Sequence, residues 1–135
     1  MNNIGGIFGI IALICILTLA LRPILQVILG QLGQNGKTVP DLLEKLFQFL
    51  TKTHRYVGFI AVVAVFLHFA LQYQQYGVIP LAGLIAGLFL VLQSFLGFGL
   101  TKQKDEERLK KMAILHRILG FLIIVSVLTH RIVGI

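Results

Sequence analysis

The chain has 135 residues, of which 57% are hydrophobic and 13% are charged, and its formal net charge is +7. A chain of this length is one domain by the usual relation of length to domain number, and so apolar a composition excludes an ordinary soluble protein. The basic residues lie between apolar segments and not in a patch with interleaved aromatic residues. We therefore expect a lipid bilayer as the partner of this protein, and no nucleic acid.

Four apolar segments are long enough to be transmembrane helices, because about 20 residues at ~1.5 Å per residue cross a hydrocarbon core of about 30 Å. They lie at about residues 4–29, 53–73, 78–100 and 112–135. The prediction is an all-α integral membrane protein, a four-helix bundle of up-down topology that forms a single domain over residues 1–135. These spans use nearly the whole chain, so we expect no soluble catalytic domain.

The first span has no basic start and no small-residue cleavage site, so we expect a retained helix and not a cleaved signal peptide. It contains Cys15, the single cysteine of the chain, and an intrachain disulfide is therefore excluded. Arg22 and Pro23 end its fully apolar part. Because an arginine at the centre of a bilayer is costly, we expect Arg22 to extend toward the lipid headgroups.

A polar, glycine-rich connection follows at residues 30–38, and Thr38, Pro40 and Asp41 then form a signal for the start of a helix. After this signal, apolar side chains recur on one helical face, and charged or amide side chains occupy the opposite face. We predict a short amphipathic helix at about residues 39–52, which lies at the membrane surface before it runs into the second span.

The remaining connections differ in charge. The second, QYQQYGVIP, carries no charge, whereas the third, TKQKDEERLKK, carries five basic and three acidic residues. Connections one and three must share a side of the membrane, and they hold most of the Lys and Arg. The positive-inside rule therefore predicts a multi-pass protein of the cell membrane with both of these connections in the cytoplasm and both termini outside.

Two segments resemble each other: HRYVGFIAVVAVFLH at residues 54–68 and HRILGFLIIVSVLTH at residues 116–130. Seven of the fifteen aligned positions are identical, and the two segments contain all four histidines. In each segment the histidines are fourteen residues apart. Along a helix, fourteen residues rise by about 21 Å and rotate by about 40° less than four full turns. The two histidines of a segment therefore lie on nearly the same face, near opposite sides of the membrane.

The second and fourth spans run in the same direction, so His54 comes level with His116, and His68 comes level with His130. Two facing histidines at each of two levels match a pair of b-type haem sites, in which each iron takes one nitrogen from each helix. Zinc or copper fits this pattern less well, because its ligands would have to gather at one point.

Glycine and arginine recur in register with the histidines. Gly58 and Gly120 each follow a histidine by one turn on the same face, where a flat macrocycle between helices needs room. Arg55, Arg117 and Arg131 directly follow three of the histidines, and the propionates of haem are anions that favour arginine as a donor. Taken singly, each feature has a plainer explanation in helix packing or interfacial placement. Their repetition favours two haem b groups.

The motifs HRYVGF with His68 and HRILGF with His130 resemble the haem-bearing helices of the ferric-reductase-like transmembrane family, which includes the NADPH oxidases, and more loosely those of respiratory cytochrome b. The resemblance implies that His54 and His116 ligate an inner haem, that His68 and His130 ligate an outer haem, and that electrons cross the membrane through both. Members of that family usually have six spans and a flavin domain. Here we expect four spans and no flavin or nicotinamide domain after Ile135.

Three functions stay open from the sequence. The first is transmembrane electron transfer, with a separate cytoplasmic flavoprotein reductase as the partner. The second is a self-contained oxidoreductase that couples quinol or quinone in the bilayer to superoxide, O₂ or a ferric chelate at the outer face. Its reaction would take place at a haem edge, because six-coordinate iron has no open position. The third is a membrane scaffold, or a transporter that moves protons or metal through the histidines. No catalytic residue is assigned, and a homo-oligomer is compatible with each function.

Overall fold

The computed structural model of the protein describes residues 4–133, and this part of the chain is built from helices and short connections. The helices are α1 (Ile4–Gln34), α2 (Asp41–Tyr76), α3 (Leu81–Lys102) and α4 (Glu106–Val133). All four are long and apolar enough to cross a membrane. The prediction of an all-α, multi-pass membrane protein is therefore confirmed. The predicted fourth span extends to residue 135, and its last two residues lie outside the described range.

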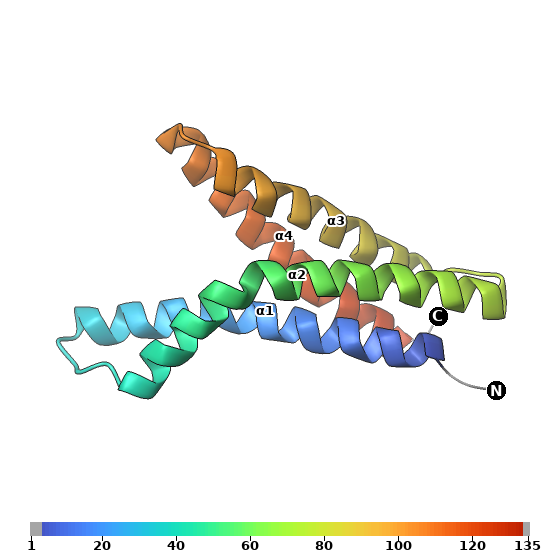
Figure 1. Cartoon of the computed structure of the whole chain (residues 1–135), viewed down its shortest axis with the longest axis horizontal. Coiled ribbons are helices and arrows are strands. Elements are labelled where there is room, and N and C mark those ends of the chain that lie inside the picture. The colour runs from blue at the N-terminus through green and yellow to red at the C-terminus, as the bar shows by residue number, and fades with distance from the viewer. Residues whose placement is uncertain (1–3, 134–135) are drawn as a thin grey trace.

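The helices form two antiparallel hairpins, α1 with α2 and α3 with α4 (Figure 1). Further contacts join α2 to α3 and α1 to α4, whereas α2 and α4 are not neighbours within the described range. These two helices therefore face each other across the diagonal of the bundle. The hairpins run together at the end that holds the start of α1 and the end of α4, and they diverge toward the α1–α2 and α3–α4 connections (Figure 1).

The predicted amphipathic helix at residues 39–52 is the first part of α2 and not an element of its own, because α2 continues without a break for 36 residues. The sequence between its ends contains no proline and only one glycine, Gly58, so no residue there strongly opposes a helix. The helix ends at Gly77, which adopts a left-handed conformation with φ of 72° and donates its N–H to the carbonyl of Tyr73.

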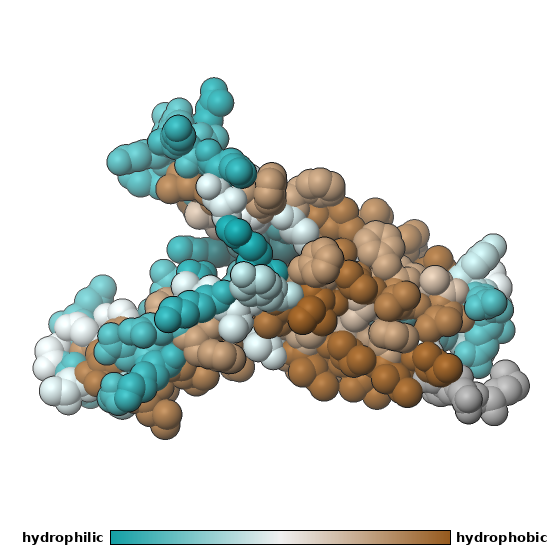
Figure 2. All heavy atoms as spheres, in the orientation of Figure 1, coloured by the Kyte–Doolittle hydropathy of each residue, from teal (hydrophilic) through white to brown (hydrophobic). Residues whose placement is uncertain are grey.

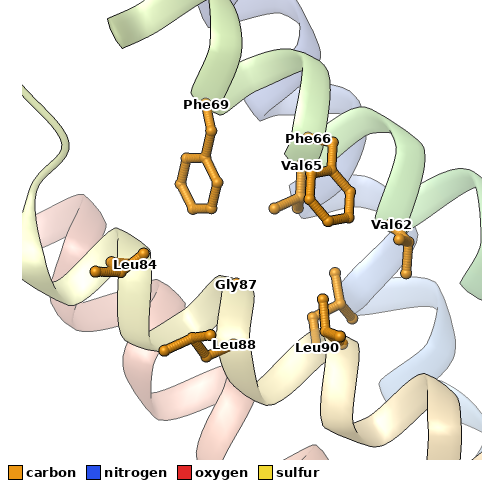
Figure 3. Close-up of a pocket in the computed structure, with 9 residues that line it drawn as sticks. Val62, Val65, Phe66, Phe69, Leu84, Gly87, Leu88 and Leu90 are labelled. Carbon is orange, nitrogen blue, oxygen red and sulfur yellow. The ribbon is translucent and has the colours of Figure 1, made fainter. Parts of the chain in front are cut away.

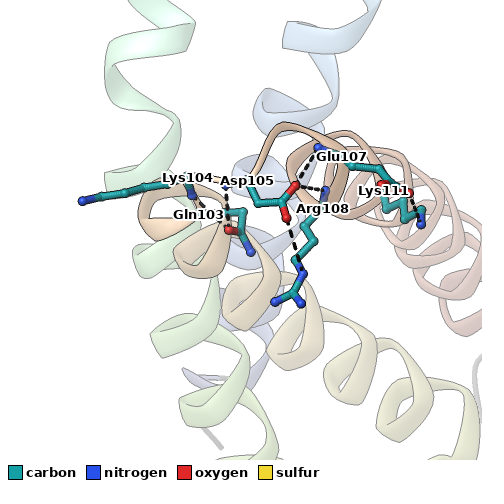
Figure 4. Close-up of polar contacts among 6 residues, drawn as sticks. All are labelled: Gln103, Lys104, Asp105, Glu107, Arg108 and Lys111. Atoms are coloured by element: carbon teal, nitrogen blue, oxygen red, sulfur yellow. Dashed lines mark hydrogen bonds and ion pairs between the residues drawn. The ribbon is translucent and has the colours of Figure 1, made fainter.

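The connection between α3 and α4 is fixed by local hydrogen bonds (Figure 4). The backbone N–H groups of Lys104 and Asp105 both donate to Gln103 Oε1. Asp105 Oδ1 in turn accepts hydrogen bonds from the backbone N–H groups of Glu107 and Arg108, which satisfies two of the free donors at the start of α4. This cap explains why the chain reverses direction so tightly here.

The surface of the molecule is apolar in its middle and polar at both ends (Figure 2). Large aromatic side chains on three different helices are mostly exposed, with Phe59 at 70%, Phe95 at 72% and Phe121 at 66% of their full accessibility. Such exposure would be unfavourable in water, but it is the pattern expected of helices in contact with lipid. The apolar band therefore supports the placement of the bundle in a membrane.

Among the buried residues, one cluster, the core layer, takes a residue from each helix: Ile16, Ala61, Leu90 and Ile123. Ala61 lies seven residues after His54 and seven before His68, and Ile123 holds the same position in α4. Seven helical residues correspond to a rise of about 10.5 Å. The core layer therefore lies midway between the two levels at which the histidines were predicted.

Candidate functional site

The structure brings the four histidines together in the two predicted pairs. The ring centroids of His54 and His116 are 6.2 Å apart, with an angle of 58° between the ring planes. Those of His68 and His130 are 6.4 Å apart, with an angle of 72°. All four rings are half-buried, and each pair joins the diagonal helices α2 and α4. The interior of the bundle therefore has two histidine pairs of nearly the same separation.

These separations fit one metal ion between two imidazole rings. A bond from a metal to a histidine nitrogen is about 2.0–2.1 Å long, and the nitrogen lies ~1.1 Å from the ring centre when the ring bonds are about 1.35 Å. Two rings on opposite sides of one ion then have centroids about 6.3 Å apart. A direct hydrogen bond of about 2.9 Å between the nitrogens would instead bring the centroids to about 5.1 Å. The observed 6.2 and 6.4 Å agree with the metal-bridged geometry and not with the hydrogen-bonded one, and they also lie within the range of about 4.5–7 Å for edge-to-face packing of two rings.

At one level the structure also assigns the roles of the two ring nitrogens. Nδ1 of His68 lies 2.8 Å from the carbonyl oxygen of Gly5 in α1. A carbonyl oxygen can only accept a hydrogen bond, so Nδ1 carries the proton and donates it. In the neutral imidazole Nε2 is then the nitrogen without a proton and could bind a metal, which is the usual arrangement of a histidine ligand.

Glycines of α1 and α3 support three of the four rings. The distances from a Cβ built on each glycine are 3.0 Å for Gly9 to His68 Nδ1, 3.2 Å for Gly83 to His130 Cε1 and 3.3 Å for Gly97 to His116 Cε1. All three are shorter than an ordinary van der Waals contact, so a side chain at these positions would displace the ring. Since Nδ1 is closer than Nε2 in each case, the supporting helix lies on the Nδ1 side.

Sequence reasoning missed these supporting glycines, although a signal exists for two of them. Gly83 and Gly97 are fourteen residues apart, the same interval that separates the histidines of each repeat. In α1, the position fourteen residues after Gly9 is Pro23. The carbonyl of Gly5 could not be recognised from the sequence, because its partner is 63 residues away along the chain.

Buried polar atoms without partners gather around the histidines. Within the described residues, the buried Nδ1 atoms of His54, His116 and His130 and the Oε1 atom of Gln93 have no hydrogen-bond partner. The backbone carbonyl of Gln93 interacts electrostatically with the His116 ring, but the two do not meet hydrogen-bond geometry. Because burial of an unpaired polar group is costly, this interior is better suited to a polar or metal-containing group than to lipid chains.

The two glycines predicted to make room for a macrocycle lie in different surroundings. A Cβ built on Gly58 would have no other atom within 4 Å, whereas one on Gly120 would lie 3.3 Å from Nε2 of Gln93 in α3. Both glycines follow their histidines by one turn of the same helix, as the sequence indicated. Their role beside a macrocycle stays a prediction.

The predicted arginines do not gather at the histidine pairs. Arg55, Arg117 and Arg131 are exposed, although the charge of Arg131 acts on the neighbouring His130. Their assignment to propionates stays a prediction. Another arginine, Arg22 of α1, is half-buried, and its Nε donates a hydrogen bond to Thr51, one turn before His54 in α2. This contact could not be recognised from the sequence, because Arg22 and Thr51 are 29 residues apart along the chain.

The donor set favours haem iron over a bare metal ion. Among the described residues, no group of three or more His, Cys, Asp or Glu side chains could hold a metal ion together. Zinc and copper sites usually take three or four ligands from the protein, whereas the macrocycle of haem supplies the equatorial ligands and needs only axial ones. Two histidines at each level are sufficient for haem and insufficient for a typical bare ion.

An apolar pocket of about 130 Å³ lies between α2 and α3, beside one histidine level. Its wall includes Val65, Phe66 and Phe69 from α2 and Leu84 and Gly87 from α3 (Figure 3). The ring of Phe69 fits against Gly87, where a Cβ would come within 2.5 Å of it. No polar side chain lines the pocket. It therefore has no group that could bind the carbonyl oxygens of a quinone.

Comparison with protein-family models, with curated proteins and with solved structures finds no match to this chain. The site is therefore interpreted from the geometry of its own residues.

Proposed function

We propose that the protein passes electrons between the two faces of a membrane through two haem b groups, one bound by His54 and His116 and one by His68 and His130. The observation that carries this proposal is the separation of 6.2 and 6.4 Å between the ring centroids of the two pairs. One such separation could be an accident of packing. Two that agree with bis-imidazole ligation, on helices that are not neighbours, are better explained by a shared ligand set.

When bound, a bis-histidine haem supplies a one-electron centre whose iron has no open position for a substrate. His54 and His68 of α2 and His116 and His130 of α4 would supply the nitrogens that hold the iron. The hydrogen bond from His68 Nδ1 to the Gly5 carbonyl would hold the ring in the ligating tautomer. The glycines of α1 and α3 would let these helices approach the rings closely enough to fix their orientation.

The core layer separates the two levels and excludes water from the space between them. Its four residues are apolar and almost fully buried, and Ala61 has no accessible surface at all. A chain of protonatable groups from one level to the other would need polar side chains or water in this layer. The layer therefore favours electron transfer over the alternative in which the histidines transport protons or metal ions.

For orientation, we propose that the α1–α2 and α3–α4 connections lie in the cytoplasm, as the positive-inside rule predicts. Electrons would then enter at His54 and His116, from a separate cytoplasmic flavoprotein, and leave at His68 and His130. The likeness of the two histidine motifs to the ferric-reductase-like family supports this direction. The alternative oxidoreductase, which would use quinol, draws no support from the apolar pocket.

The decisive experiment is an absorption spectrum of the purified protein, oxidised and dithionite-reduced, with haem quantified per chain. We expect a low-spin spectrum and two haems per chain. A protein that folds, is expressed with sufficient haem and shows no Soret band would overturn the proposal. Reduction by quinol in liposomes without a flavoprotein would instead favour the self-contained oxidoreductase.

A further inference from the structure

We propose that Arg22 binds a carboxylate at the inner histidine level, and that this carboxylate is a propionate of the haem held by His54 and His116. The inference rests on the proposed function. It assigns the propionate contact to an arginine of α1, outside both histidine repeats, and not to the arginines that directly follow the histidines.

The position of Arg22 is the first argument. Its Nε is hydrogen-bonded to Thr51 Oγ1, and Thr51 precedes His54 by three residues, or about one turn, in α2. The hydrogen bond therefore holds the guanidinium about one helical turn from the inner histidine level, on the side of the α1–α2 connection. A group as wide as haem, bound between His54 and His116, could reach it.

The way in which Arg22 is held is the second argument. Its Nε donates a hydrogen bond of 3.2 Å to Thr51 Oγ1, and its guanidinium carbon lies 5.8 Å from the centroid of the Phe47 ring. Thr51 and Phe47 are four residues apart and share one face of α2. Guanidinium has five N–H donors in a planar fork, and this hydrogen bond uses only the one at Nε. The two terminal nitrogens remain for a bidentate contact with a carboxylate.

The third argument is the missing counterion. Each ion pair of the described residues joins two exposed side chains at the start of α2 or of α4: Lys45 with Asp41, Arg108 with Asp105, and Lys111 with Glu107. None of them includes Arg22, whose side chain is half-buried. Because a partly buried guanidinium is stabilised by an anion, and no ion pair of the described residues supplies one, we infer that a bound molecule does.

Two bound molecules carry suitable oxygens, the propionate of haem and the phosphate of a lipid headgroup. The hydrogen bond of Arg22 to Thr51, one turn before His54, favours the propionate, because it holds the guanidinium beside the inner histidine level. Membranes of different lipid charge distinguish the propionate from the phosphate. A propionate contact is independent of lipid charge, whereas a phosphate contact depends on it.

The test is a redox titration of Arg22→Gln in nanodiscs of neutral lipid and of anionic lipid, with Lys52→Gln as the matched control. A positive charge near the iron disfavours the ferric state, so its removal should lower one midpoint potential and leave the other unchanged. We expect at least a tenfold change in the ratio of oxidised to reduced haem at fixed potential, which is about 59 mV for a one-electron couple. Lys52 follows Thr51 directly and is exposed, and its replacement should produce a much smaller change.

Two unchanged potentials in Arg22→Gln would overturn the inference, and a shift that occurs only in anionic lipid would assign Arg22 to a phosphate instead. If Arg22→Gln does not assemble, Arg22→Lys decides the question. Lysine keeps the charge but cannot bind in the bidentate manner, so we expect a smaller fall in one midpoint potential only. An unchanged potential would count against the proposal. A wild-type protein without haem would refute the proposed function itself, which is a different result from haem-loaded variants with unchanged potentials.

Discussion

Nδ1 of His68 in α2 donates a hydrogen bond of 2.8 Å to the carbonyl oxygen of Gly5 in α1. One turn further along α1, Gly9 lies so close to the same ring that a Cβ would stand 3.0 Å from Nδ1. The carbonyl fixes which nitrogen carries the proton, and the glycine fixes how near the helix can come. Together they orient Nε2, so α1 contributes to the site although it contains no histidine.

A side chain at Gly9 should therefore disturb one haem site selectively. We expect Gly9→Leu to push the His68 ring out of line with His130, to reduce haem content toward one per chain, and to destabilise the bundle by about 1 to 3 kcal/mol through overpacking. The measurements are haem per chain and thermal unfolding followed by circular dichroism.

The matched control for Gly9→Leu is Gly30→Leu in the same helix. A Cβ on Gly30 would have no atom within 4 Å, and replacement of a helical glycine by leucine gains helix propensity. Haem content should stay at two per chain in this variant. Equal haem loss in both variants would show that the close approach of Gly9 to His68 is not what holds the ring.

Removal of single histidines should reveal the pairing. His68→Ala and His130→Ala should each lose one haem and give the same remaining spectrum, because the two residues share one site. His54→Ala and His116→Ala should match each other and leave the complementary spectrum. Two haems retained in any of these variants would contradict the assignment of its ligand, and a double variant His54→Ala/His68→Ala that keeps one haem would contradict the pairing.

These same residues show which features of the structure could be predicted from the sequence. The four spans and the level pairing of the histidines were predictable, since both follow from properties of single helices, namely the length of an apolar run and the angle and rise of fourteen residues. The supporting role of Gly9 and the place of Arg22 were not. They depend on how far one helix is shifted and rotated against another, and no local pattern specifies that. The sequence did indicate that the amphipathic segment runs into the second span, and the structure makes them one helix.

Gly58 provides a test of the space beside the inner haem. Because no atom lies within 4 Å of a Cβ on Gly58, we expect Gly58→Leu to be tolerated by the protein without haem. With haem bound, the branched side chain should occupy the region of the macrocycle, so the site at His54 and His116 should lose its haem first. The readouts are the unfolding temperature of the haem-free protein and the haem content after reconstitution.

Gly120→Leu is the companion variant, and it should behave differently. Gln93 lies 3.3 Å from the Cβ position of Gly120, so this substitution should destabilise the protein even without haem. Unchanged haem content in Gly58→Leu would show that Gly58 serves only helix packing. A similar loss of haem-free stability in both variants would show that the space beside Gly58 is already needed by the protein.

Under the proposed function, the orientation of the bundle decides which histidine pair receives the electrons. Lys37, Lys45 and Lys52 lie in or near the α1–α2 connection and five further basic residues in or near the α3–α4 connection, whereas the α2–α3 connection has none. We therefore expect Gln75→Cys, made in a Cys15→Ser background, to react with an impermeant thiol reagent on intact cells, and Glu106→Cys to react only after lysis. Both positions are exposed, so poor accessibility would not explain a failure to label. The reverse labelling pattern would place His68 and His130 at the cytoplasmic side, and the flavoprotein would then have to donate electrons at that pair.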